Sequence, residues 1–142
     1  MLEIVPCNTD DFQTLANIWE RSVRATHFFL EEKDIVEIKS ALIPNYFPNV
    51  DLYAVIDNEI FVGFIGLSAD RIEMLFIDSS CRGKGYGSLL INFAKENGAK
   101  KVDVNEQNIS ALKFYNNHGF RIKDRQDKDE AGRPYPILHL SL

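Results

Sequence analysis

A glycine-rich stretch in the middle of the chain has the residue types of an anion-binding loop. Residues 82–87 read Arg-Gly-Lys-Gly-Tyr-Gly, and they join an apolar segment to a pattern typical of a helix. Glycines allow the backbone to come close to a ligand, and the free N–H groups of a first helical turn attract anions together with the helix dipole. Arg82 and Lys84 add positive charge that suits a phosphate. The stretch therefore predicts a site for a pyrophosphate.

Three kinds of glycine-rich loop have a similar composition, and the spacing of the glycines and their neighbours distinguishes them only in part. A P-loop needs a lysine followed by Ser or Thr after its last glycine, and that pair is missing here. A dinucleotide-binding loop needs Gly-x-Gly-x-x-Gly, whereas the glycines here are Gly83, Gly85 and Gly87. Asp103 nevertheless lies at a suitable distance along the chain to hold a ribose, so a dinucleotide site stays open. A glycine-rich turn that binds nothing is the third alternative.

A second motif follows at residues 108–120, which read Asn-Ile-Ser-Ala-Leu-Lys-Phe-Tyr-Asn-Asn-His-Gly-Phe. Together with the Arg-x-x-Gly-x-Gly of residues 82–87, it resembles the signatures of the GNAT superfamily of acyl-CoA N-acyltransferases. The matching core spans about residues 60–120, and residues 21–27 and 132–136 are similar to a small bacterial subgroup. The resemblance implies an N-acetyltransferase that moves an acetyl group from acetyl-CoA to a primary amine by direct attack. A non-catalytic CoA-binding sensor or interaction domain on the same fold is the alternative.

Two side chains are candidates for moving the protons of such a transfer. The resemblance places Tyr115 beside the sulfur of CoA, where its hydroxyl would be the general acid for the departing thiolate; packing within a helix is its other possible role. Glu73 lies in an apolar run, where desolvation would raise the pKa of its carboxyl toward that of a useful general base. A structural ion pair with Arg71 is the alternative for Glu73.

The resemblance also implies how coenzyme A would be held. In this superfamily the strand before the glycine loop has a bulge and splays from its neighbour, so that pantetheine pairs with its backbone. Two asparagines are candidates for hydrogen bonds to the pantetheine amides, although one of them is also a good helix N-cap. The candidate cofactor-binding residues are Phe76, Ile77, Arg82, Gly83, Lys84, Gly85, Tyr86, Gly87, Ser88, Asn105 and Asn108.

The amine side has fewer signals. His27 lies between the first two expected helices, where this superfamily builds its acceptor pocket. It could bind the acceptor, serve as a second base, or be a structural hydrogen-bonding group. Trp19 and Phe28 are candidates either for the core or for the wall of this pocket. The acceptor itself is not defined, because the amine of a small molecule and that of a protein both fit.

Alternating and helical patterns outline the elements that position these residues. Asp10 and Gln13 resemble a capping box at the start of the first helix, and Pro44 is expected to end the second. Adjacent hairpins followed by βαβ crossovers indicate an α/β (mixed α+β) fold of the GNAT type, with a mixed, mostly antiparallel sheet and helices on both faces. Strands are expected near residues 2–5, 52–56, 60–67, 72–77, 101–105, 120–123 and 136–142, and helices near residues 10–23, 33–43, 88–97 and 108–118.

The composition excludes several classes of partner. The 142 residues fit one domain, 1–142, and the net charge of −5 disfavours nucleic acid, whose partners need a basic face. No apolar run is long enough to cross a membrane, and the N-terminus lacks the parts of a signal peptide, so we expect a cytoplasmic protein without membrane contact. Cys7 and Cys81 lack metal-ligand spacing, which predicts reduced thiols and no metal. The oligomeric state is not indicated.

Overall fold

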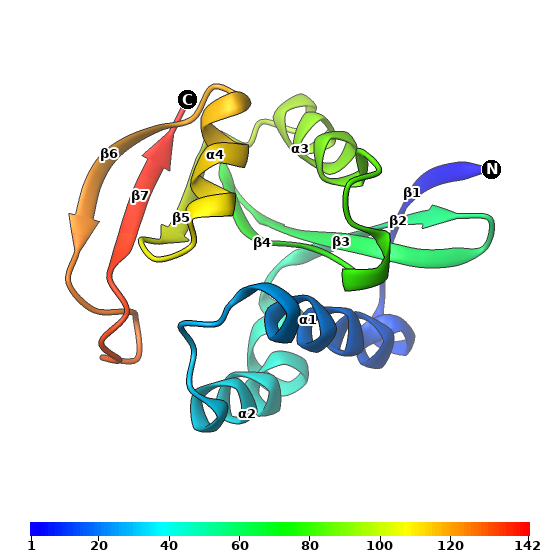
Figure 1. The fold of residues 1–142 in the computed structure, drawn as a ribbon. Helices are drawn as coiled ribbons and strands as arrows, with labels where there is room; N and C mark the ends of the chain where they lie inside the picture. Colours follow the sequence, from blue (N-terminus) through cyan, green and yellow to red (C-terminus); the bar gives the residue numbers. More distant parts are fainter.

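A seven-stranded sheet forms the centre of the computed structural model, which describes residues 1–142 (Figure 1). The strand order is β1-β2-β3-β4-β5-β7-β6, and every neighbouring pair is antiparallel except the parallel pair β4–β5. The predicted mixed, mostly antiparallel sheet is thus confirmed. The strands are β1 (Leu2–Pro6), β2 (Asp51–Asp57), β3 (Ile60–Ser68), β4 (Arg71–Ile77), β5 (Lys101–Asn105), β6 (Arg121–Gln126) and β7 (Ile137–Ser141).

Helices cover both faces of this sheet (Figure 1). One apolar cluster of 16 buried residues packs α3 and α4 against the sheet, and a second of 11 buried residues packs α1 and α2 on the opposite face. Burial of these two apolar layers is the main force that holds the helices to the sheet. No helix combines the length and the apolar character that crossing a membrane would require. The helices are α1 (Phe12–Thr26), α2 (Glu32–Ala41), α3 (Tyr86–Glu96) and α4 (Ile109–Asn117).

The strands in the middle of the sheet diverge, and this makes room for a site. β4 and β5 pair at only two positions, at the start of both strands, and then separate. Along β3, Gly66 pairs with Met74 but the next residue, Leu67, pairs with Ile72, so Glu73 is left out of the ladder as a bulge. Both features agree with the bulge and splay that the resemblance implied for this strand. The backbone of β4 beyond the bulge is consequently unpaired on its β5 side.

The start of α1 differs from the prediction. The capping box is formed by Asn8 and Asp11, not by Asp10 and Gln13, and it opens a 3₁₀ turn, Thr9–Asp11, that leads into the helix. The Asn8 side chain accepts from the N–H of Asp10, while Asp11 reaches back to the N–H of Asn8 at 3.0 Å. A short turn before the helix therefore takes the cap that the sequence pattern assigned two residues later.

The end of α2 also differs. The helix ends at Ala41, and Pro44 lies inside a π-helical turn, Leu42–Tyr46, that continues it. Proline has no N–H and cannot continue the α-helical hydrogen-bond ladder. Pro44 therefore does end the regular α-helix, but the chain goes on in a wider turn rather than leaving the helical path.

Candidate active site

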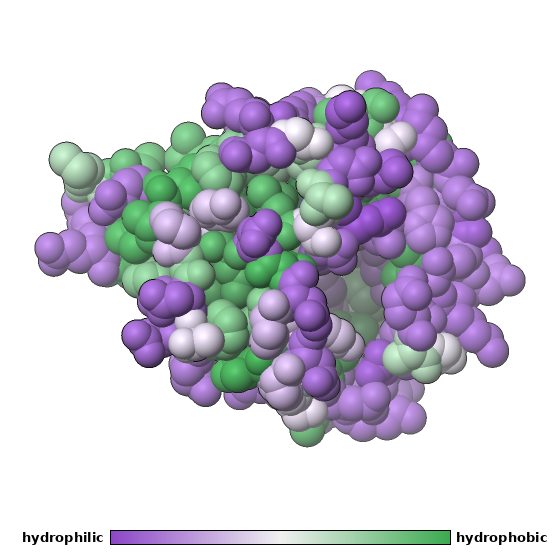
Figure 2. Space-filling view, turned by 180° about the vertical axis from the view of Figure 1, so that it is seen from behind, coloured by the Kyte–Doolittle hydropathy of each residue, from purple (hydrophilic) through white to green (hydrophobic).

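A cavity of about 450 Å³ lies where β4 and β5 separate. The glycine loop and the start of α3 bound it on one side, α4 on another and the last turn of α1 on a third. About half of its lining residues, 12 of 25, are hydrophobic, so it can hold an apolar arm as well as polar groups. Seen from behind, the surface is hollowed beside strands β5, β7 and β6, and the rim of the hollow is mostly hydrophilic (Figure 2).

The glycine loop has the backbone that an anion site needs. Gly83 and Gly85 have φ angles of 78° and 85°, in the left-handed region that favours glycine. Gly85 is the N-cap of α3 and provides no side chain, so the N–H groups of the first turn are left free for a ligand. A Cβ built on Gly85 would meet no atom within 4 Å, which shows open space above the loop. The residues present thus fit a pyrophosphate.

The third glycine and the two cations of the loop have different roles. A Cβ on Gly87 would lie 3.2 Å from the ring of Phe114, so Gly87 allows α3 and α4 to approach closely. Arg82 lines the cavity, whereas Lys84 is exposed and does not. Of the two cations predicted for the phosphate, the structure therefore brings Arg82 to the cavity and leaves Lys84 at the surface.

The hydroxyl of Tyr115, a buried residue on α4, has no hydrogen-bond partner in the protein. The side chain lies on α4, lines the cavity and is only 6% exposed. No fully buried side-chain nitrogen or oxygen lacks a hydrogen bond, and the Tyr115 hydroxyl makes none, so this hydroxyl is not completely enclosed by the protein. Burial raises the pKa of Tyr115 well above its usual range. The phenol is therefore protonated at neutral pH and can donate to a ligand.

His27 is held in one tautomer by hydrogen bonds on both ring nitrogens. The Thr26 hydroxyl donates to the Ser22 carbonyl, so its oxygen is free to accept from Nδ1 of His27 at 2.8 Å. On the other side, Asn108 uses its Oδ1 to cap α4 through Ala111 and points its Nδ2 at Nε2 of His27, 3.2 Å away. Burial, with the positive charge of Arg82, lowers the pKa of His27 to about 4. His27 is thus a neutral group in the cavity wall.

The depressed pKa of His27 should make the protein less stable in mild acid. Below about pH 6.5 the unfolded chain binds a proton at His27 that the folded chain does not, so the free energy of unfolding falls between about pH 6.5 and 4. His27→Gln keeps an acceptor for Asn108 but cannot be protonated. In urea unfolding, we expect the wild type to lose about 2 kcal/mol more than the variant between pH 7 and 5.

A second histidine provides the comparison for this experiment. The pKa of His118 is also lowered by burial and by Lys95, but this residue is only partly buried. His118→Gln should therefore remove less of the acid sensitivity than His27→Gln does. If the free energy of unfolding fell equally with pH in the wild type and in His27→Gln, the folded protein would bind a proton at His27 over this pH range just as the unfolded chain does, which would contradict the prediction.

Glu73 lies in the cavity wall but not in the apolar setting that the sequence predicted. Its side chain is 37% exposed and lies 3.8 Å from Arg71, which makes a shorter ion pair, 2.9 Å, with Asp103. The expectation of a desolvated carboxylate was wrong because the bulge takes Glu73 out of the strand's alternation. The alternative of an ion pair with Arg71 is present, though long. The site therefore keeps a hydrated carboxylate rather than a buried one.

The remaining predicted residues fall into two groups. Phe76, Ile77, Asn105 and Asn108 all line the cavity, as do all the predicted residues of the glycine loop and the start of α3, 82–88, except Lys84. Trp19 and Phe28 do not line the cavity. Trp19 is 4% exposed and packs edge-on against Phe76 in the core beneath the site, and Phe28 is 82% exposed. Core packing, the other prediction for these two, thus holds for Trp19 only.

Among the lining residues to which the sequence assigned no role are Thr26 and Cys81. Thr26 orients His27, and Cys81 lies in the wall before Arg82. The signal for Thr26 was its position next to a candidate histidine at a helix end. Asp103, which could have held a ribose, has its carboxylate taken up by Arg71 and His139, so the structure gives the dinucleotide alternative no support.

Comparison with known proteins confirms the resemblance seen in the two motifs. A family model described as an acetyltransferase (GNAT) domain matches residues 37–135, and the chain belongs to this family. It is accordingly an acyltransferase that uses acetyl-CoA and acts on an amine.

The chain is also similar to individual acetyltransferases along nearly its whole length. The chain is 37% identical to the peptidyl-lysine N-acetyltransferase YjaB of Salmonella typhimurium over 142 residues, which cover 99% of this chain and 97% of that protein. The Escherichia coli protein of the same name is 37% identical over 134 residues, 93% of this chain and 90% of the relative. The solution structure of apo-form YjaB from Escherichia coli matches with a TM-score of 0.90 at 34% identity, over 99% of this chain and 97% of that one.

A more distant solved structure shares the fold alone. The PaiA N-acetyltransferase from Thermoplasma acidophilum, solved in complex with coenzyme A, matches with a TM-score of 0.73 at 19% identity. The match covers 100% of this chain and 99% of that one. The α/β architecture is thus shared with a protein of very different sequence.

Proposed function

We propose that this protein acetylates the side-chain amine of lysine in a peptide or protein, with acetyl-CoA as the acyl donor. The single observation that carries the proposal is Tyr115, which lines the cavity next to the glycine loop and whose hydroxyl has no protein partner. Relatives at 37% identity are named peptidyl-lysine N-acetyltransferases. Glu73, whose side chain is 37% exposed, also lines the cavity, which favours an acceptor that arrives as a cation.

The cofactor would be held mainly by backbone groups. The N–H groups between Gly83 and Ser88 would bind the pyrophosphate, because they surround the start of α3 and the space at Gly83 and Gly85 is open. The unpaired edge of β4 at Phe76 and Ile77 offers the backbone groups with which pantetheine would pair. Asn105 and Asn108 lie across the gap from that edge and are the candidates for its amide groups. Arg82 contributes charge at the phosphate end.

The reaction forms one bond, breaks another and moves two protons. The amine nitrogen attacks the thioester carbonyl, an amide bond forms, and the carbon–sulfur bond breaks. Tyr115 would give its proton to the departing thiolate, whose reference pKa is about 8.5. Glu73, hydrated at the mouth of the cavity, would take the proton of the amine through water. His27, which is neutral, would border the amine without adding charge.

The proposed function is tested with a synthetic peptide that has a blocked N-terminus and one free lysine. Mixed with acetyl-CoA and the protein, it should gain one acetyl group at the lysine while one equivalent of CoA thiol is released. A matched peptide with trimethyl-lysine should react no faster than without protein. Binding of acetyl-CoA without transfer to this or any other amine would favour the sensor or interaction domain instead.

Glu73→Gln tests the proposed base. At neutral pH we expect turnover to fall by roughly 100-fold, and the loss should shrink as pH rises toward the lysine pKa of about 10.4, because the amine then needs no base. Melting temperature should hardly change, since Glu73 is exposed and its ion pair is long. Both quantities are measured on one purified variant.

Glu106→Gln is the matched control for this variant. Glu106 is an exposed carboxylate that pairs with Arg125 and does not line the cavity. It should change neither turnover nor the shape of the pH–rate profile. A Glu73→Gln protein with a lower melting temperature and an unchanged profile would leave Glu73 a structural role only, and a water chain or His27 would be the next candidate base.

A further inference from the structure

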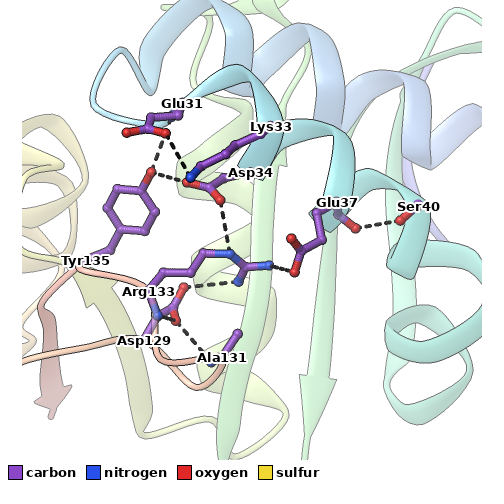
Figure 3. A network of polar contacts seen from close by, with 9 residues as sticks. All are labelled: Glu31, Lys33, Asp34, Glu37, Ser40, Asp129, Ala131, Arg133 and Tyr135. Atoms are coloured by element: carbon purple, nitrogen blue, oxygen red, sulfur yellow. Dashed lines mark hydrogen bonds and ion pairs between the residues drawn. The ribbon is translucent and has the colours of Figure 1, made fainter.

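A buried polar network joins α2 to the loop between β6 and β7 (Figure 3). Its centre is Arg133, whose side chain is only 13% exposed. The guanidinium meets three carboxylates: Glu37 at 2.6 Å, Asp129 at 3.2 Å and Asp34 at 3.4 Å. Two of them belong to α2 and one to the loop itself, so Arg133 binds the two segments together.

Tyr135 makes the second connection of the same network. Its hydroxyl donates to the carboxylate of Asp34 and accepts from the backbone N–H of Glu31 at 3.2 Å. Both Tyr135 and Asp34 are buried, at 5% and 7% exposure. A buried carboxylate is costly unless it is paired and hydrogen-bonded, and here it has both kinds of partner. Such networks add little to stability compared with apolar packing, so a positional role is the better explanation.

The network leads into the wall of the cavity. The ring of Tyr135 packs edge-on against Phe29, with centroids 6.2 Å apart, and Phe29 lies 5.3 Å from the ring of His27. His27 in turn contacts Phe76 and Asn108 at the cavity. The loop between α1 and α2, residues 27–31, is therefore fixed at one end by the cavity and at the other by Tyr135.

The topology explains why such a connection matters. Strands β5, β7 and β6 join the rest of the sheet through the two paired positions of β4 and β5. Where β4 and β5 have separated, the loop between β6 and β7 lies near α2 (Figure 1). The network of Arg133 and Tyr135 closes this side, and neither residue lines the cavity itself.

We infer that Arg133, Tyr135 and Asp34 form a clasp that positions the α1–α2 loop, and with it His27, as the amine-side wall of the cavity. These three are positioning residues for the acceptor and not for acetyl-CoA, whose proposed contacts lie on β4, the glycine loop, β5 and the start of α4. The inference rests on the proposed function, because it takes the wall at His27 as the amine side.

Tyr135→Phe and Arg133→Met are the variants that open the clasp. With the single-lysine peptide as acceptor, we expect the KM for the peptide to rise by about 10-fold or more, since small misplacements at a reacting site have large effects. The KM for acetyl-CoA should change by less than about 2-fold. Arg125→Met is the matched control, because Arg125 pairs with Glu106 and Asp127 at the same hairpin without touching α2. It should change neither KM.

Amide hydrogen exchange tests the clasp without relying on turnover. Tyr135→Phe removes the acceptor of the Glu31 N–H, so exchange should speed up at residues 28–31 and not at the glycine loop. If the wild type does not acetylate the peptide, the proposed function fails, while this measurement still decides on the clasp. Should Arg133→Met fail to fold, Asp34→Asn/Arg133→Met removes both buried charges. Unchanged exchange and an unchanged peptide KM in folded variants would overturn the inference, as would equal rises in both KM values.

Discussion

Replacing Gly85 by valine is expected to weaken acetyl-CoA binding by about 100-fold, or roughly 2.7 kcal/mol. Gly85 caps α3 with a φ of 85°, and a β-branched residue is strained there. Any relaxation of residue 85 toward negative φ would turn the first N–H groups of α3 away from the proposed anion site. If the backbone held instead, the new side chain would enter that open space. Either outcome removes the anion site, and calorimetric titration with acetyl-CoA measures the loss.

Gly98→Val separates loss of the site from strain alone. Gly98 ends α3 with a φ of 88°, and a Cβ there also meets nothing within 4 Å. The two glycines thus match in conformation and in surroundings, but Gly98 does not line the cavity. Gly98→Val should lower the melting temperature much as Gly85→Val does and leave the affinity for acetyl-CoA unchanged. Equal affinities in the two folded variants would remove the glycine loop from the cofactor site.

The elements of the fold could be predicted because each has a local signal. In the turn between β2 and β3, Asn58 and Glu59 take positive φ angles of 49° and 68°, as a two-residue hairpin turn requires. Gly98 and Gly119 end α3 and α4 in the left-handed conformation that marks helix ends. Signals of this kind lie within a few residues of one another, so one sequence is enough to find them.

The site was predicted only where a motif repeats a known arrangement. The glycine loop and Tyr115 carry such motifs, and the structure brings them to one cavity. Glu73 was expected to be buried because the alternation of a strand was extended across it, and a bulge depends on the register with β3, which one strand cannot show. Phe28, at the surface, shows the same limit for a loop, whose side chains follow no period.

The clasp could not be predicted because its members lie about 100 residues apart. Asp34 and Tyr135 meet across 101 positions, and the pairing depends on how two distant segments pack. Charged residues are usually solvated, so Arg133 in a polar stretch gave no hint of burial. Residues 132–136 were nevertheless noted for their similarity to a bacterial subgroup. The structure supplies a physical reason for their arrangement, since Arg133 and Tyr135 both hold the α1–α2 loop.

The other large effect is expected from the hydroxyl of Tyr115. Tyr115→Phe should lower kcat by about 10²- to 10⁴-fold, the usual contribution of a general acid, and change the affinity for acetyl-CoA little. The ring would keep its packing against Phe114 and Phe120, so the fold should be retained. Because burial raises the pKa of Tyr115, its proton is present throughout the usual assay range. The loss should therefore be constant from roughly pH 6 to 9, as measured by initial rates with the lysine peptide.

Tyr53→Phe shows whether the effect belongs to this hydroxyl or to any tyrosine of the core. Tyr53 lies on β2, packs against Phe93 and does not line the cavity. Removing its hydroxyl should leave kcat unchanged. If solvent supplied the proton to the thiolate, Tyr115→Phe would retain most of its activity, because water in the cavity could replace a phenol that only fills space. If Tyr115 acted by binding the cofactor, the KM for acetyl-CoA would rise while kcat stayed the same. Only a fall in kcat at constant acetyl-CoA affinity fits a group that acts as the carbon–sulfur bond breaks.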